Sequence, residues 1–155
     1  MRRMASPLHQ RGIASIEFAA VFSALFVLFY AIATFGALFF TQQLMARAAE
    51  DGVRAVAVLP NGPAPDPLRV RDVVFDALAG SPLVPASAGQ TPASRRSWLA
   101  ANLQVAVTSS AAGDVTVQLV YSYSANPLMP SIALLDASRW VPDRLTQTAT
   151  IARPV

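Results

Sequence analysis

The chain has 155 residues, with 12 basic residues, nine acidic residues, one histidine and no cysteine. This length allows one modest domain beside a membrane segment, and the absence of cysteine excludes a disulfide framework and a thiolate metal site or nucleophile. Three of the 12 arginines precede Gly12, which leaves nine arginines against nine acidic residues. A balanced remainder without a basic patch argues against nucleic acid as a partner.

An uncharged apolar segment runs from Phe18 to Phe40, immediately after Glu17. As a helix its 23 residues would measure about 35 Å, enough to cross the hydrocarbon core of a bilayer, whereas the apolar region of a secretory signal is only about 7–15 residues. Three arginines precede the segment, and only Arg47 and Arg54 follow it closely. This bias predicts a single-pass protein with a cytoplasmic N-terminus and an extracytoplasmic remainder.

The predicted membrane helix has two different faces. At 100° per residue, four aromatic side chains fall within about 80° of one another. They are Phe18, Phe22, Phe26 and Phe29. The opposite side carries Ala20, Ala24 and Ala31, with Glu17 near this stripe. Small residues let membrane helices approach closely, so the alanine stripe is a candidate packing face, although alanine is also common in membrane helices in general.

Two helices are predicted on the N-terminal side of the remainder. The first continues the membrane helix from Thr41 to about Val58, where Gly52 weakens it and a cluster of prolines ends it. The second runs from Leu68 to Leu78, because apolar residues recur there at helical spacing and Asp66-Pro67 is a typical helix start. Gly80 closes this helix.

Beyond a loop over residues 81–94, the apolar period changes from 3.6 to 2, which predicts half-buried strands. The strands are Leu103–Val107, Val115–Tyr123 and Leu145–Ile151, with Ser109–Asp114 as a hairpin connection and Asn126–Pro142 as a long loop. The third strand places Thr146, Thr148 and Thr150 on one face. The predicted fold class is therefore α+β, with an N-terminal transmembrane helix that extends out of the membrane, a short helix and a three-stranded antiparallel sheet.

The inventory of reactive side chains is small. The single histidine, His9, precedes the membrane helix, so neither a histidine triad nor a histidine metal site is available in the remainder. Asp66, Asp72 and Asp76 lack the spacing of a calcium loop and are interpreted as a solvated helix face. Tyr121 and Tyr123 share the apolar face of a strand and are interpreted as core. We expect no enzyme activity, no cofactor and no metal.

Two stretches resemble a known family. Residues 11–40, RGIASIEFAAVFSALFVLFYAIATFGALFF, and residues 42–56, QQLMARAAEDGVRAV, resemble the TadE-like pseudopilins of the tight-adherence (Flp pilus) systems of bacteria. A weaker similarity continues through Tyr121-Ser122-Tyr123 and Pro127-Leu128-Met129-Pro130. In that family a basic leader ends in glycine, and a hydrophobic segment with a Glu-Phe-like pair follows.

The resemblance implies a processing event and a set of partners. A prepilin peptidase would cut between Gly12 and Ile13, so that residues 1–12 are a leader, 13–58 the membrane helix and its extension, and 59–155 a small extracytoplasmic domain. Glu17, at the fifth position of the mature chain, would serve maturation or assembly. The implied partners are the peptidase, other pilin or pseudopilin subunits, the inner-membrane pilus platform and the lipid bilayer.

A second interpretation remains open from the sequence. The chain would then be an uncleaved single-pass protein whose anchored domain binds a partner in an extracytoplasmic secretion complex. Cleavage after Gly12 separates the two interpretations. An anchored enzyme is disfavoured by the inventory of side chains given above.

Overall fold

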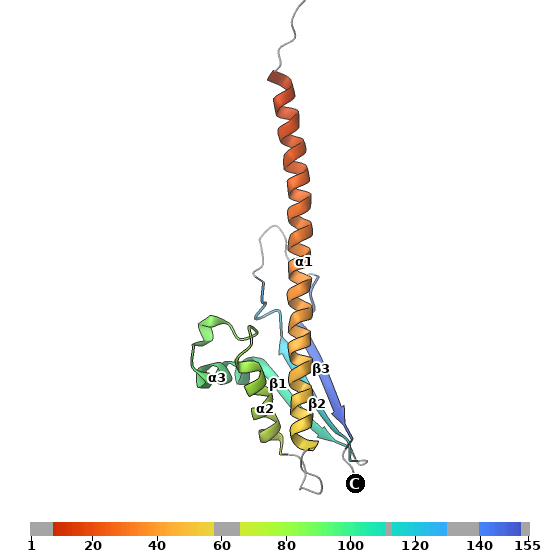
Figure 1. The fold of residues 1–155 in the computed structure, drawn as a ribbon, viewed down its shortest axis with the longest axis vertical. Helices are drawn as coiled ribbons and strands as arrows, with labels where there is room; N and C mark the ends of the chain where they lie inside the picture. The colour runs from red at the N-terminus through yellow and green to blue at the C-terminus, as the bar shows by residue number, and fades with distance from the viewer. Residues whose placement is uncertain (1–7, 58–65, 111–112, 130–139, 153–155) are drawn as a thin grey trace, which may run out of the picture. The chain divides into compact units, whose positions relative to one another are not determined.

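The computed structural model describes residues 8–57, 66–110, 113–129 and 140–152 (Figure 1). Along the chain the elements are α1 (Leu8–Ala57), α2 (Pro67–Ala79), the 3-10 helix η1 (Ala86–Ala88), α3 (Pro92–Asn102), β1 (Leu103–Ser109), β2 (Val115–Ser122) and β3 (Arg144–Ile151). The backbone packs as two units, residues 1–36 and residues 37–155, and helix α1 contributes to both. We describe each unit by itself.

The second unit contains an antiparallel sheet in the order β1-β2-β3. The register places Val105 opposite Leu119 and Leu119 opposite Gln147. The predicted hairpin between β1 and β2 is confirmed, and Gly113 lies there at φ 90°, a backbone conformation that favours glycine. The sequence therefore predicted the three strands and the α+β class correctly.

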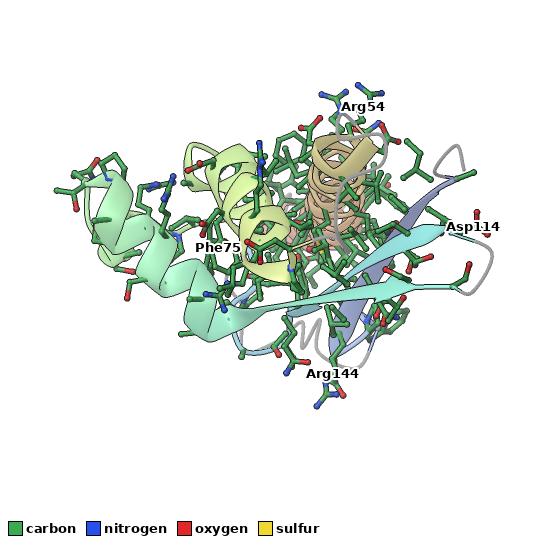
Figure 2. All side chains as sticks on the ribbon, turned by 90° about the horizontal axis from the view of Figure 1, so that it is seen from below. Arg54, Phe75, Asp114 and Arg144 are labelled. Atoms are coloured by element: carbon green, nitrogen blue, oxygen red, sulfur yellow. The ribbon has the colours of Figure 1, made fainter. Side chains whose placement is uncertain are left out.

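One face of the sheet supplies the core. Alternate residues of β2 are fully buried, namely Val115, Val117, Leu119 and Tyr121. Helix α2 and the part of α1 that belongs to this unit lie on the same side of the sheet (Figure 2). The opposite face is polar: Thr146, Thr148 and Thr150 are exposed, and the Thr150 hydroxyl lies 2.9 Å from that of Thr116. The predicted threonine face is therefore confirmed as the outer face of the sheet.

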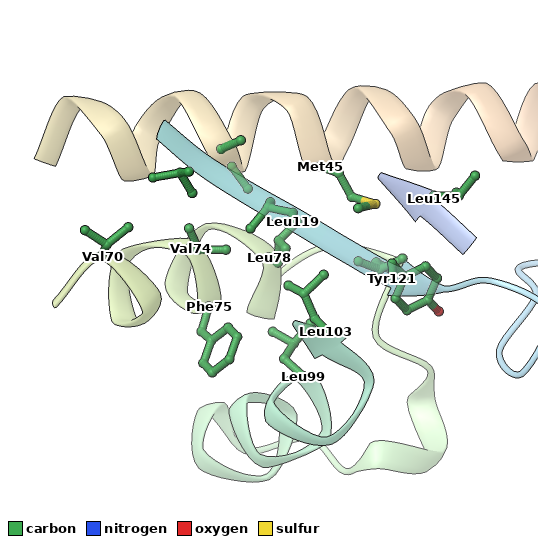
Figure 3. Close-up of a cluster of buried hydrophobic side chains, with 14 of the residues drawn as sticks. Met45, Val70, Val74, Phe75, Leu78, Leu99, Leu103, Leu119, Tyr121 and Leu145 are labelled. Atoms are coloured by element: carbon green, nitrogen blue, oxygen red, sulfur yellow. The ribbon is translucent and has the colours of Figure 1, made fainter. Parts of the chain in front are cut away.

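Helix α2 begins and ends as the sequence predicts. The Asp66 carboxylate caps it by accepting a hydrogen bond from the Leu68 amide at 2.9 Å, Pro67 occupies the first turn, and Gly80 is the C-cap. Its buried residues Val70, Val74 and Leu78 recur at helical spacing and face the core between α1 and β2 (Figure 3). Such an amphipathic stripe is what fixes a surface helix on a sheet.

Helix α3 was not predicted. Its first three residues lie in the segment that the sequence analysis interpreted as a loop, which also contains η1. Thr91 caps α3 by accepting a hydrogen bond from the Ser94 amide at 3.2 Å, and Pro92 follows it. The Arg95 guanidinium donates hydrogen bonds to the carbonyls of Ala79, Ser81 and Val84, with Nη2–O distances of 2.8 Å to Ser81 and 3.2 Å to Val84. Arg95 thus ties α3 to the end of α2.

Gly52 lies where α1 approaches α2 and β2 most closely. A Cβ built on Gly52 would lie 3.0 Å from Val74 Cγ2, 3.3 Å from Val70 Cγ1 and 3.6 Å from Val117 Cγ1. By its sequence context alone, Gly52 is predicted only to weaken the helix. In the structure the missing side chain is what allows the two helices and the sheet to come together.

Tyr121 and Tyr123 belong to the core, as predicted. Both are buried, and their ring centroids are 6.4 Å apart. The Tyr121 hydroxyl donates a hydrogen bond to the Asn126 carbonyl at 2.8 Å. Burial, with a smaller contribution from Tyr123, raises the pKa of Tyr121 to about 12. Of the long loop predicted over Asn126–Pro142, residues 130–139 lie outside the described residues.

Candidate processing and assembly segment

The N-terminal part of α1 exposes nearly all of its apolar side chains. Residues 12–29 are all exposed, including Phe18 at 71% and Phe29 at 65%. A helix with this length and composition, Gly12–Val56, satisfies the requirements for crossing a membrane. This exposure distinguishes the segment from the core helix of a water-soluble protein, whose apolar side chains are buried. It is consistent with single-pass anchoring in a bilayer.

The predicted cleavage point lies inside α1. The helix begins at Leu8, so Gly12 and Ile13 belong to its second turn. Gly12 has open space around its Cα, and Ile13 is 67% exposed. Glycine weakens a helix by about 1 kcal/mol relative to alanine, so the Gly12–Ile13 bond lies at a locally weakened position of α1.

Glu17 lies on the same helix, one turn after Ile13, with an exposed side chain. No hydrogen bond or ion pair to its carboxylate is found among the residues that the structure describes. A carboxylate at the edge of an apolar segment is costly to leave without a partner when it enters lipid. The role of Glu17 in maturation or assembly stays a prediction.

Because α1 is a regular helix, the predicted alanine stripe and the predicted aromatic face lie on different sides of it. Ala20 and Ala24 are exposed, and Ala31 is half-buried. On the aromatic face the rings of Phe18 and Phe22 stack, with centroids 6.1 Å apart. Further along, the Thr34 hydroxyl donates to the Tyr30 carbonyl at 2.8 Å, which satisfies that polar group inside the helix. The role of the alanine stripe as a packing face stays a prediction.

Helix α1 carries a charged face further along that the sequence analysis did not assign to any role. In the second unit, Arg47, Glu50, Asp51 and Arg54 are all exposed. From the sequence, Arg47 and Arg54 were used to predict membrane orientation, and Glu50 and Asp51 were given no role. The signal for a common face was nevertheless present, because residues three and four apart on a helix are neighbours.

The acidic side chains of α2 do not form a site. Asp66, Asp72 and Asp76 are exposed, as the sequence analysis interpreted them, and Asp76 pairs with Arg96. Within the described residues no group of three or more histidine, cysteine, aspartate or glutamate side chains is arranged to hold a metal ion.

The described residues thus comprise an N-terminal helix long and apolar enough to cross a membrane, followed by a small α+β domain. Residues 12–54 match the model of the TadE-like protein family, which confirms the predicted resemblance over that segment. The match begins at Gly12 and ends at Arg54, so it covers most of α1. No curated protein and no solved structure matches the chain.

Proposed function

We propose that the protein is a pseudopilin-like structural component of a tight-adherence (Flp-type) pilus machine, matured by a prepilin peptidase that cuts after Gly12. The observation that carries this proposal is the family match over residues 12–54, which starts at the proposed cleavage point and includes Glu17. The exposed apolar surface of α1 in this segment supports it, because such a surface needs lipid or other apolar helices around it.

In this proposal the chain has one orientation in the cytoplasmic membrane. The three arginines before Gly12 stay on the cytoplasmic side, and the α+β domain lies outside the cytoplasm. Its partners are the prepilin peptidase, the lipid bilayer, other pilin or pseudopilin subunits and the inner-membrane platform of the pilus machine. The family match supports a structural role in this proposal.

Cleavage changes the charge of the segment in a specific way. Water adds across the Gly12–Ile13 peptide bond, which leaves a carboxylate on Gly12 of the leader and a free ammonium on Ile13. The same step removes the three leader arginines. The mature helix then begins with a single positive charge, followed one helical turn later by Glu17.

The new ammonium has a natural partner in Glu17 of a neighbouring subunit. Ile13 and Glu17 are four residues apart, about 6 Å along a helix, so a neighbour displaced by one turn brings the two charges level. Coulomb attraction between them is larger near the bilayer than in water. Setting the register between chains is the best-attested use of such ionic groups.

The first test is the intact mass and N-terminal sequence of the membrane-extracted protein, expressed with and without a prepilin peptidase. We expect a chain that starts at Ile13 only when the peptidase is present. A chain that still begins near Met1 in both samples would overturn the proposal and favour an uncleaved anchored domain that binds an extracytoplasmic partner.

The second test concerns Glu17. We expect Glu17→Ala to insert into the membrane at the normal level and to abolish pilus-linked adhesion. Glu17→Gln is the matched control, because it keeps the size and polarity of the side chain and removes its charge, with an NH2 donor in place of one acceptor oxygen. If the charge of Glu17 is what matters, Glu17→Gln should abolish pilus-linked adhesion as well. Normal adhesion by Glu17→Ala would contradict any role of this residue in assembly.

A further inference from the structure

The charged face of α1 consists of Arg47, Glu50, Asp51 and Arg54. Figure 2 shows Arg54 on the side of α1 that faces away from the sheet, and all four residues are exposed. The opposite side of the same turns is buried in the core of the domain. The buried residues on that side are Met45, Ala48, Ala49, Gly52 and Val53. This stretch of α1 therefore has one face occupied by its own domain and one face without a partner among the described residues.

Pairing within the helix satisfies these charges only weakly. Arg54 Nη2 lies 3.9 Å from Glu50 Oε2, and the two side chains are 71% and 59% exposed. Arg47 and Asp51 are also four residues apart, but the basic residue comes first, which is the less favourable order on a helix. No ion pair between Arg47 and Asp51 is found in the described part of the chain. The face thus retains charges of both signs for an external partner.

Along α1 the charges of this face follow the order positive, negative, negative, positive. This order is unfavourable for two arrangements of a second copy of the chain. A parallel neighbour in register would place each charge opposite the same charge. An antiparallel neighbour centred on this face would place Arg47 opposite Arg54 and Glu50 opposite Asp51. Both arrangements oppose like charges, which is how an interface excludes wrong geometries.

A parallel neighbour displaced along the helix by three to four residues, about 5–6 Å, has the opposite property. At a displacement of four residues, Arg47 of one copy meets Asp51 of the other, and Glu50 meets Arg54. At three residues, Arg47 meets Glu50 and Asp51 meets Arg54. A displacement of seven residues brings Arg47 to Arg54 and is repulsive again. For copies that share one orientation in the membrane and are therefore parallel, the charge pattern selects this narrow range of stagger.

We propose that the charged face of α1 binds the same face of a second copy of this chain, parallel to it and staggered by about one helical turn. Such a contact uses different halves of the face on the two copies, so the pair is not related by a two-fold axis. The inference deepens the proposed function by naming the partner. Its stagger equals the four-residue separation of Ile13 and Glu17 in the sequence.

The chain contains no cysteine, so single cysteines can be introduced without background. Two differently tagged full-length copies are co-expressed in membranes, one with Arg47→Cys and the other with Asp51→Cys, and treated with a short bifunctional maleimide. A second pair, Glu50→Cys with Arg54→Cys, tests the same stagger and leaves the first pair of charges intact. The controls are the same-site combinations at 47 and at 51, and the combination of Arg47→Cys with Arg54→Cys.

We expect both staggered combinations to give several-fold more cross-linked heterodimer than any control combination. Adding Asp51→Arg to the 50–54 pair should remove most of its product, whereas Asp72→Arg, the same charge change at an exposed position on α2, should leave the product unchanged. Co-purification of the two tags measures self-association independently of the cross-linker.

Stronger cross-linking of same-site pairs would show an in-register contact and overturn the inference. Copies that co-purify without any staggered product, or copies that do not co-purify, would also overturn it. The N-terminal residue is determined in the same samples. A chain that starts at Ile13 but lacks the staggered product refutes the inference alone, and a chain that is never cut refutes the proposed maturation.

Discussion

Residues 12–36 and residues 37–57 of α1 have the same secondary structure and opposite surroundings. In the first stretch residues 12–29 are exposed on all sides, although most of their side chains are apolar. In the second stretch a stripe including Met45, Ala48 and Val53 is buried and the other side is charged. Helical secondary structure by itself therefore does not show whether a stretch packs against its own domain or exposes apolar side chains on all sides. The pattern of side chains around the axis tells the two apart.

The difference follows from what each stretch has to contact. The second stretch contacts one sheet and one helix, so only a narrow stripe of it needs to be apolar. The first stretch needs apolar side chains in every direction if lipid or other membrane helices surround it. The boundary found by backbone packing, between Gly36 and Ala37, precedes the change from the apolar segment to the charged one.

The largest expected effect comes from cutting one buried side chain in the second stretch. Met45 is 0% exposed and lies in the core beside Leu145 (Figure 3). We expect Met45→Ala to lower the free energy of unfolding of the domain by about 2–5 kcal/mol, because the lost burial is compounded by a cavity. The measurement is denaturant unfolding of the full chain in detergent, followed by tryptophan fluorescence.

Phe26→Ala in the first stretch is the matched control for Met45→Ala. Phe26 is 47% exposed, and we expect its truncation to leave the unfolding midpoint of the domain unchanged. Equal losses from the two variants would mean that the two stretches do not differ as the structure indicates.

A second prediction uses pH to probe the core under α1. The pKa of Tyr121 is raised from 10.0 to about 12, so ionisation favours the unfolded chain. The contribution of the protonated Tyr121 hydroxyl to the free energy of unfolding is therefore complete below pH 10 and is lost as the pH rises to about 12. A difference of this size corresponds to roughly 2–3 kcal/mol.

Tyr121→Phe tests the cause of that pH dependence. We expect the variant to lose most of the decline in stability between pH 10 and 12. It should also be less stable at neutral pH by about 1 kcal/mol, because the hydrogen bond to the Asn126 carbonyl is gone. If the stability of Tyr121→Phe still declined to the same extent between pH 10 and 12, the decline would be caused by another titrating group.

The third and smallest prediction compares Gly36 and Gly52, the two glycines of α1 that follow the proposed cleavage point. A side chain at Gly52 meets Val74 and Val70, whereas a Cβ at Gly36 meets nothing within 4 Å. We expect Gly52→Val to destabilise the domain by about 1–3 kcal/mol through overpacking. Gly36→Val should have no such cost. A Gly52→Val protein of normal stability would show that α1 and α2 separate easily.

Much of the fold follows from local rules that the sequence displays. Asp66 and Pro67 specify the start of α2, and strict alternation specifies β2, because a capping side chain and a period of two act within a few residues. Helix α3 escaped prediction because its signal was weak: only Leu99 is buried in it, so no apolar stripe marks it. Thr91 and Pro92 were the available sign of its start.

For α1, too, some features could be predicted from the sequence and others only from the tertiary structure. The sequence by itself determined the apolar length of residues 18–40, the glycine at 12 and the glutamate at 17, because these depend on composition and spacing along one helix. Only the tertiary structure decided which side of α1 the domain covers. That choice left Arg47, Glu50, Asp51 and Arg54 in solvent and turned Gly52 from a helix-weakening residue into the contact point of three elements. The reason is physical: burial is a property of what packs against a residue, and the partners of α1, Val70 and Val117, are distant from it in sequence.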